Sequence, residues 1–460
     1  MPASGDGDGG GVSRRRFLRN LGGGAALAAM PGAAGATATG GQAPRPNVVF
    51  IYTDDQDFTE RGCYGGNALS PNMDSLARDG MKFSRFYVSS AVCAPSRYNV
   101  LSGRYASRSE SLQKKCPPSG YPNIGWEPQV YGEKWTLPRA LQRAGYATGM
   151  VGKWHQGCGN LDGKMPTDTP MSDPEAQKKV RKNYRRVLSS IRECGFDYAA
   201  SAYSHNPGAA TRDGWFWWPQ ELGCHNMEWV TKGALDFIEQ NQDRPFFLYM
   251  APTLVHSPPP TESMKANPRA TWSGMLDKAP DVQPSRKSVI ERCRQAGIEI
   301  PDGYSNSFPA GTLWMDDGIG AVLDRLDELG LAENTMVIVA SDNGNFDKFS
   351  CYEGGAHMPC VVRWPEVVPQ GSVCTDLVNN VDLSRTIMEV CGADRPSGMQ
   401  VDGTNILPAL RGSSSYRRRS LYLEVTRERA VVSEDNFKYI AVRHPEDMRK
   451  KQKKGKRFTH

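Results

Sequence analysis

The chain has 460 residues, of which 39% are hydrophobic and 23% charged, a composition that excludes disorder throughout and is typical of a globular protein. The formal net charge is +6, but seven lysines and arginines lie within residues 449–457, and the body of the chain is mildly acidic, so charge gives no argument for nucleic-acid binding. The eleven cysteines show neither a tight disulfide framework nor a CxxC zinc pair, which leaves their redox state open.

Residues 1–36 are expected to be an export signal. The pair Arg14-Arg15 precedes an apolar, Ala- and Gly-rich run from Leu21 to Ala34, and small residues that suit cleavage follow. This pattern resembles a twin-arginine signal peptide. The run is too short and too rich in glycine to span a membrane. No cysteine lies near the cleavage region, so a lipid anchor is not expected. We expect export through the twin-arginine machinery to the periplasm or beyond, without a stable membrane anchor; a disordered basic leader is the alternative.

Two predicted strands, far apart in the sequence, end in oxygen-bearing side chains. Residues 47–52 and 335–340 are continuous apolar runs with β-branched residues, which is typical of strands buried on both faces. The side chains that follow them are Asp54, Asp55, Asp342 and Asn343. Such residues are also ordinary turn and N-cap residues. Taken together, three carboxylates and an amide oxygen favour a hard divalent cation, Ca²⁺ or Mg²⁺.

Within residues 92–104 the sequence predicts a helix that begins at Cys93. Pro95 stands in its first turn, where a missing N–H costs nothing, and Gly103 ends it. A helix N-terminus offers free N–H groups and a positive dipole end to an anion. Arg97, one turn after Cys93, adds a fixed fork of donors. The pattern indicates a nucleophile beside an anion site; a buried structural cysteine is the alternative.

Basic side chains follow two further predicted strands. Residues 146–151 lead to Lys153 and His155, and residues 245–250 lead to His256. A lone histidine beyond a strand is more often a loop or core residue than a catalyst. That interpretation is kept for His205, His225 and His444.

Helical patterns alternate with these strands. They cover residues 71–79, 134–144, 227–240 and 312–329. The alternation predicts an α/β fold, with a large, mostly parallel sheet sandwiched by helices. Ligands of such sheets bind outside the carboxyl ends of the strands, where the functional groups above all lie.

Three other regions carry weaker signals. Residues 158–220 are polar, then aromatic at 215–218, and are expected to be an insertion near the site mouth; the aromatic run could stack on sugars, but packing within the loop is favoured. Residues 257–310 are predicted to be rich in loops that carry specificity. Residues 412–445 hold three short strand-like runs and predict a small antiparallel sheet, followed by a solvated basic tail at 446–460.

The segment Cys93-Ala94-Pro95-Ser96-Arg97, followed by Leu101-Ser102-Gly103-Arg104, resembles the C-x-P-S-R…[TS]-G-R signature of type I sulfatases, in the alkaline phosphatase-like superfamily. The resemblance covers about residues 46–442, and includes a G-K-W-H segment at 152–155 and a K-x-x-x-Y-E-G-G segment at 348–355. It implies that a formylglycine-generating enzyme converts Cys93 to formylglycine. It also implies a Ca²⁺ ion, with Mg²⁺ less favoured, held by Asp54, Asp55, Cys93, Asp342 and Asn343.

The resemblance implies hydrolysis of sulfate esters, and a sulfated carbohydrate is the expected substrate. The residues that it marks as catalytic are Cys93, Arg97, Lys153, His155, His256 and Lys348. It implies a catalytic domain at 46–411 and a C-terminal subdomain at 412–445, although the chain departs from the family pattern after residue 440 and leaves the completeness of that subdomain open. Two alternatives remain: a phosphodiesterase or phosphonate monoester hydrolase on the same fold, and a non-catalytic metal- or glycan-binding protein with Cys93 unconverted.

Overall fold

One eight-stranded sheet organises the chain. The computed structural model describes residues 45–116, 120–208, 214–300 and 308–444; the expected export signal and basic tail lie outside these ranges. In sheet order the strands are β13 (Ser372–Cys374), β2 (Met81–Phe83), β12 (Cys360–Arg363), β11 (Thr335–Ser341), β1 (Asn47–Thr53), β8 (Phe246–Ala251), β4 (Ala147–Lys153) and β6 (Tyr198–Tyr203). Only β12 pairs antiparallel to its neighbours, so the prediction of a mostly parallel sheet is confirmed.

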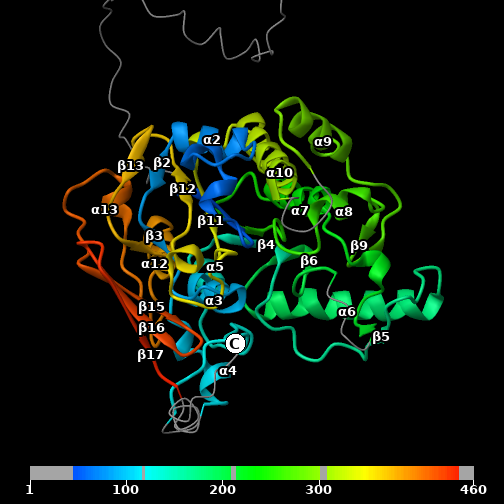
Figure 1. The fold of residues 1–460 in the computed structure, drawn as a ribbon, viewed down its shortest axis with the longest axis horizontal. Helices are drawn as coiled ribbons and strands as arrows, with labels where there is room; N and C mark the ends of the chain where they lie inside the picture. Colours follow the sequence, from blue (N-terminus) through cyan, green and yellow to red (C-terminus); the bar gives the residue numbers. More distant parts are fainter. Residues whose placement is uncertain (1–44, 117–119, 209–213, 301–307, 445–460) are drawn as a thin grey trace, which may run out of the picture. The chain divides into compact units, whose positions relative to one another are not determined.

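Helices cover both sides of the sheet (Figure 1). The first group contains α2 (Pro71–Arg78), α7 (Met227–Gln240) and α10 (Phe308–Glu328); α2 and α7 contact strands of the sheet, and α10 packs against both of them. The second contains α3 (Cys93–Ser102), α5 (Leu137–Arg143) and α12 (Asn380–Val390). Each central strand is therefore buried on both faces, which is why β1 and β11 read as unbroken apolar runs.

The interpretation of residues 158–220 as an insertion is wrong. This segment contains the twenty-residue helix α6 (Pro174–Glu193) and strand β6, which extends the central sheet beside β4. The polar composition of α6 conceals an apolar face, because its buried residues recur at helical spacing at Val180, Val187 and Ile191. Strand β6 is built from alanine, serine and tyrosine and lacks the β-branched run that predicts a strand.

Smaller elements complete the fold. The other helices are α4 (Glu110–Gln113), α8 (Pro260–Lys265), α9 (Arg286–Gln295), α11 (Glu353–Ala356) and α13 (Leu407–Leu410). Two-residue strands pair as β3 (Phe86–Tyr87) with β14 (Val378–Asn379), β5 (Met165–Pro166) with β7 (Trp215–Phe216), and β9 (Ala270–Thr271) with β10 (Gly274–Met275). The predicted C-terminal sheet is present as β15 (Ser420–Val425), β16 (Glu428–Ser433) and β17 (Lys438–Val442), all antiparallel. None of the helices in the described ranges has both the length and the apolar character needed to cross a bilayer.

Candidate active site

The register of β1 against β11 brings the two acidic strand ends together. Thr53 pairs with Ser341 at the end of the ladder, and the Asp342 N–H donates to the Thr53 carbonyl oxygen at 3.0 Å. The Asp55 N–H then donates to Asp342 Oδ1 at 3.2 Å, and Asn343 Nδ2 donates to Asp55 Oδ1 at 2.6 Å. Residues almost 290 positions apart in the sequence thus form one oxygen-rich cluster at the carboxyl edge of the sheet.

Helix α3 carries Cys93 to this cluster. Cys93 is the first residue of the helix and is fully buried, and its Sγ lies 3.3 Å from Asp54 Oδ1 and 3.8 Å from Asp55 Oδ1. Gly103 ends the helix with a φ of 72°, a left-handed conformation that suits glycine. The prediction of a helix that starts at a cysteine is confirmed.

Arg97 points from the first turns of α3 into the same cluster. Its Nη2 lies 2.7 Å from Asp342 Oδ2 and 3.5 Å from Asp54 Oδ1, and the side chain is fully buried. The guanidinium also lies over the ring of Tyr52, 5.7 Å from its centroid. A buried arginine held between two carboxylates presents its remaining donors in a fixed geometry.

Lys153 reaches the site because its strand is bulged. The pairing of β4 with β6 shifts register between Val151 and Gly152, and such a bulge re-aims the following side chain. Only glycine fits at position 152, because its φ is 91° and a Cβ there would lie 2.0 Å from the carbonyl oxygen of Ala251. The Lys153 Nζ lies 2.8 and 2.7 Å from the two carboxylate oxygens of Asp54.

A second lysine pairs with the neighbouring aspartate, Asp55. Lys348 Nζ lies 2.7 Å from both carboxylate oxygens of Asp55. Asp55 itself has a φ of 55°, a conformation that costs free energy in a residue with a side chain. The same strain occurs at His155, whose φ is 50°. Backbone strain held at such positions is typical of functional sites.

The two histidines occupy different places. His256 Nε2 lies 3.4 Å from Asp55 Oδ2, so this side chain joins the cluster directly. His155 makes no hydrogen bond to the cluster, and its buried Nδ1 has no partner among the described residues. Gln156 ties this segment to the start of α3, because its Nε2 donates to the carbonyl oxygens of Ala94 and His155.

Charge and burial shift several pKa values in opposite directions. Burial raises the pKa of the Cys93 thiol well above its ordinary value, so an unmodified thiol stays protonated at neutral pH. Burial alone would also raise the pKa of Asp54, but the charge of Lys153 and other nearby cations holds it well below its usual range. Burial, followed by the charge of Lys153, lowers the pKa of His155, which is therefore neutral and able to accept a proton.

The donor set fits a hard divalent cation. One ligand atom from each of Asp54, Asp55, Cys93 and Asp342 falls within 4.8 Å of the others. The buried Oδ1 of Asn343 accepts no hydrogen bond from the described residues, so an amide oxygen remains free for a cation beside these groups. Carboxylate and amide oxygens are the ligands of Ca²⁺ and Mg²⁺.

His225 is a hydrogen-bonded core histidine, one of the two interpretations kept for it from the sequence, but its place beside the site was not predicted. His225 is fully buried, its Nδ1 lies 2.6 Å from Thr253 Oγ1, and its Nε2 lies 2.9 Å from the carbonyl oxygens of both His256 and Pro258. It therefore holds the loop that carries His256. No local signal marks this role, because its partners are 28 to 33 residues away.

The interpretation of His205 as a core residue agrees with the structure. His205 stacks on Phe216 with ring centroids 5.3 Å apart, inside an aromatic cluster in which Trp218 stacks on Trp272 at 4.1 Å. Trp218 is fully buried. Most of the aromatic run at 215–218 thus packs internally, as favoured from the sequence, although Trp215 remains exposed.

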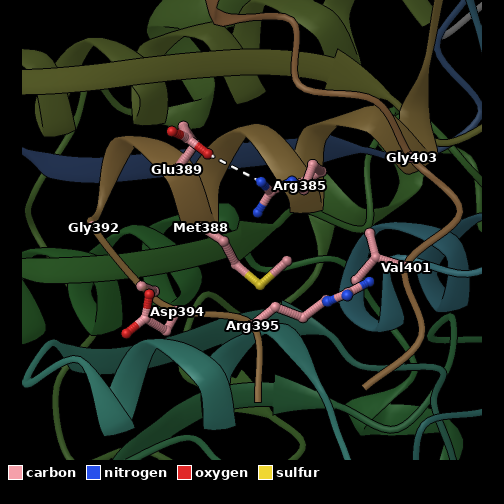
Figure 2. A pocket seen from close by; sticks show the side chains of 9 residues that line it. Arg385, Met388, Glu389, Gly392, Asp394, Arg395, Val401 and Gly403 are labelled. Atoms are coloured by element: carbon pink, nitrogen blue, oxygen red, sulfur yellow. Dashed lines mark ion pairs between the residues drawn. The ribbon is translucent and has the colours of Figure 1, made fainter. Parts of the chain in front are cut away.

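A surface pocket elsewhere contains none of these residues. It has a volume of about 500 Å³ and lies along α12, with Arg385 paired to Glu389 and with Met388 and Arg395 on its wall (Figure 2). Its ion pair between Arg385 and Glu389 lies within one helix and is partly exposed, unlike the buried ion pairs of the cluster at the sheet edge. The candidate active site is therefore the buried cluster.

Comparison with known proteins identifies the family of this chain. The sulfatase family model matches residues 46–393, which is most of the chain. The chain belongs to the sulfatase family. A second model, the C-terminal region of N-sulphoglucosamine sulphohydrolase, matches residues 341–449. As a sulfatase of the alkaline phosphatase-like superfamily, the protein is an enzyme that hydrolyses sulfate esters.

Individual relatives cover most of this sulfatase. Human arylsulfatase A is 27% identical over 82% of this chain and 70% of its own length. An N-acetylglucosamine-6-O-sulfatase of Bacteroides thetaiotaomicron is 25% identical over 86% of this chain and 77% of its own length.

Solved structures show the same fold. One, determined with its substrate D-glucosamine-2-N,6-O-disulfate, is 20% identical, covers 89% of this chain and 96% of its own, and has a TM-score of 0.57. The phosphonate monoester hydrolase of Silicibacter pomeroyi is 17% identical, covers 87% of this chain and 90% of its own, and has a TM-score of 0.52. The fold alone is therefore shared by hydrolases of sulfate and of phosphonate esters.

Proposed function

We propose that this sulfatase removes sulfate from a sulfated carbohydrate, with residue 93 converted to formylglycine and with a Ca²⁺ ion in the acidic cluster. The observation that carries the proposal is the position of Cys93. Its sulfur lies 3.3 Å from Asp54 at the start of a buried helix, in a cluster that contains Arg97 and two lysines. Nearby carboxylates disfavour a thiolate, whereas the surrounding cations suit a substrate anion.

Formylglycine and Ca²⁺ would each supply a defined chemistry. Formylglycine, when formed, supplies a hydrated aldehyde with one hydroxyl to attack sulfur and a second whose proton loss releases sulfate. Ca²⁺, when bound, lowers the pKa of the attacking hydroxyl and offsets negative charge on the sulfate. The side chains that would hold the ion, beside residue 93, are Asp54, Asp55, Asp342 and Asn343.

The remaining side chains have separate tasks. Arg97 and Lys153 donate hydrogen bonds to the non-bridging sulfate oxygens, where charge is spread in the transition state. His256, with Lys348 beside Asp55, protonates the leaving alcohol. His155, kept neutral by burial, accepts the proton of the second hydroxyl. Arg97 lies on α3 and Lys153 ends β4, whereas the two histidines and Lys348 lie in the loops that follow β4, β8 and β11. Their contacts within the cluster position them before substrate binds.

A carbohydrate substrate is supported by relatives. One relative acts on N-acetylglucosamine-6-sulfate groups by its name, and a structural neighbour binds a disulfated glucosamine. The match of the C-terminal region to an N-sulphoglucosamine sulphohydrolase model points the same way. Export by the twin-arginine machinery and conversion by a formylglycine-generating enzyme are parts of the same proposal.

The test compares sulfate, phosphate and phosphonate esters of the same alcohols, using protein made with a formylglycine-generating enzyme. We expect kcat/KM to be highest for the sulfate esters and expect the Cys93→Ala variant to release no sulfate. Faster hydrolysis of the phosphonate esters would instead make the protein a phosphonate monoester hydrolase. Binding of sulfated sugars without release of sulfate would favour a non-catalytic glycan-binding protein.

A further inference from the structure

Two aromatic side chains stand partly in solvent beside the active site. Trp126 is 50% exposed and Phe349 is 39% exposed, and their rings contact edge to face with centroids 5.4 Å apart. Exposed aromatic side chains that cluster rather than scatter usually mark a binding surface. We call this pair the aromatic wall.

The aromatic wall is held rigidly although it is exposed. On one side, Ile124 forms an antiparallel bridge with Thr426, with N–H to O distances of 2.9 and 2.8 Å, and Ser111 Oγ donates to the Glu127 carbonyl oxygen at 2.7 Å. On the other side, the Phe349 N–H donates to the Ala91 carbonyl oxygen at 3.0 Å. Fixed backbone on both sides means that the rings do not need to be ordered when a ligand binds.

The wall borders the catalytic groups directly. Trp126 stacks on the His155 ring, with centroids 5.4 Å apart and an interplanar angle of 28°. Phe349 follows Lys348, whose ammonium group bonds Asp55 in the cluster. One end of the site is therefore lined by buried charges, and its rim by exposed aromatic rings.

We propose that the aromatic wall binds the sugar ring whose hydroxyl carries the sulfate; this inference rests on the proposed function. The sulfate group has no apolar surface and is held by Arg97 and Lys153, whereas a pyranose ring has an apolar face of C–H groups. Aromatic rings bury such a face and leave the sugar hydroxyls in water. The wall thus makes Trp126 and Phe349 specificity-determining residues for the leaving group.

The test separates ring binding from sulfate binding with two probes. The first is the best wild-type substrate among monosulfated hexoses and hexosamines, and the second is inorganic sulfate, used as a competitive inhibitor. For Trp126→Ala and Phe349→Ala we expect KM for the sulfated sugar to rise about tenfold. The inhibition constant of inorganic sulfate should change less than about twofold, because sulfate does not contact the wall.

Phe349→Ala is the more decisive variant, since Phe349 has no ring contact with His155 and the change should leave kcat nearly unaltered. The matched control is Phe346→Ala, which removes a 75% exposed phenylalanine from the same loop and should change neither constant. An unchanged KM in both wall variants of an active enzyme would overturn the inference. If the inhibition constant of inorganic sulfate rose by the same factor as KM for the sulfated sugar, the inference would also be overturned. The rings would then only support the groups that hold the sulfate. A wild-type protein that hydrolyses no sulfate ester would instead overturn the proposed function.

Discussion

Two buried clusters in this protein each pair an arginine with carboxylates, but they differ in whether their buried polar atoms find partners. Between α7, α9 and α10, Arg286 donates to both carboxylate oxygens of Glu228 at 3.1 and 3.0 Å, and Trp314 Nε1 donates to the same carboxylate at 2.9 Å. The remaining donors of Arg286 reach the carbonyl oxygens of Ser263 and Ala266 at 2.9 and 3.0 Å. Each charged side chain in this cluster therefore has hydrogen-bonded partners, and we call it the matched cluster.

The cluster at the sheet edge contains buried polar atoms without such partners, and we call it the unmatched cluster. Asn343 Oδ1, Arg97 Nε and His155 Nδ1 are buried without a hydrogen-bond partner among the described residues, and Asp55 and His155 have strained backbones. Buried polar atoms are normally paired, so unpaired ones concentrated at one place indicate a site that is completed by a ligand. The comparison predicts that changes at the sheet edge affect activity, whereas changes at the Glu228 cluster affect stability.

The largest effect is expected at residue 93. Cys93→Ala should lower sulfate-ester hydrolysis by a factor on the order of 10⁵ or more, because the nucleophile is lost. Its thermal unfolding should stay close to that of the wild type, since the carboxylates of the cluster keep their ion pairs with Arg97 and the two lysines. Kinetics and calorimetry on the same preparation test this. A variant that keeps a substantial rate would remove residue 93 from the mechanism.

The opposite result is expected at the matched cluster. Glu228→Ala leaves Arg286 buried without its carboxylate and should lower the free energy of unfolding by about 3–5 kcal/mol. Denaturant titration measures this loss, and kcat per folded molecule should be unchanged. Lys232→Ala, which removes an exposed ion pair on the same helix, is the control and should cost less than about 1 kcal/mol. A similar loss in both variants would contradict the distinction.

Metal binding should stabilise the unmatched cluster. Ca²⁺ at a hundred times its dissociation constant should raise the free energy of unfolding by about 2.7 kcal/mol, and chelation should reverse the gain. The Asn343→Leu variant should lose most of this stabilisation, whereas Glu228→Ala should keep it. Thermal shifts with and without Ca²⁺ provide a readout independent of activity. Equal shifts in wild type and Asn343→Leu would place the ion elsewhere.

The smallest effect is expected at His225, which positions the loop that carries His256. His225→Ala removes the hydrogen bonds to the His256 loop and should lower kcat about tenfold for esters of ordinary alcohols, which need a proton on the leaving oxygen. Hydrolysis of 4-nitrophenyl sulfate should be nearly unaffected, because nitrophenolate leaves without that proton. His205→Phe, a change inside the aromatic cluster, should alter neither rate. An equal loss on both substrates would make His225 a purely structural residue.

The sequence predicted the parts whose signal is local. Strands β1 and β11 were placed within a residue of their ends, because burial on both faces leaves an unbroken apolar run. Helix α3 was placed because its proline, glycine and cysteine stand at fixed offsets. The candidate site followed from these strand and helix ends, since the ends of parallel strands meet at one edge.

The parts that the sequence did not predict depend on distant partners. Strand β6 is recognisable only by its pairing with β4, because alanine and serine do not favour a strand by themselves. The segment at 257–310, expected to be loop-rich, also contains helices α8 and α9. The roles of His225 and Trp126 depend on contacts with residues about thirty positions away, which no local pattern records.

The central claim is that residue 93 is formylglycine, and the mass of one peptide tests it directly. Trypsin should release residues 86–97, which contain Cys93, from protein made in its native host. The account predicts a peptide in which the sulfur of Cys93 is replaced by oxygen and two hydrogens are lost. An unmodified cysteine at residue 93, in a preparation that hydrolyses sulfate esters at full rate, would contradict it.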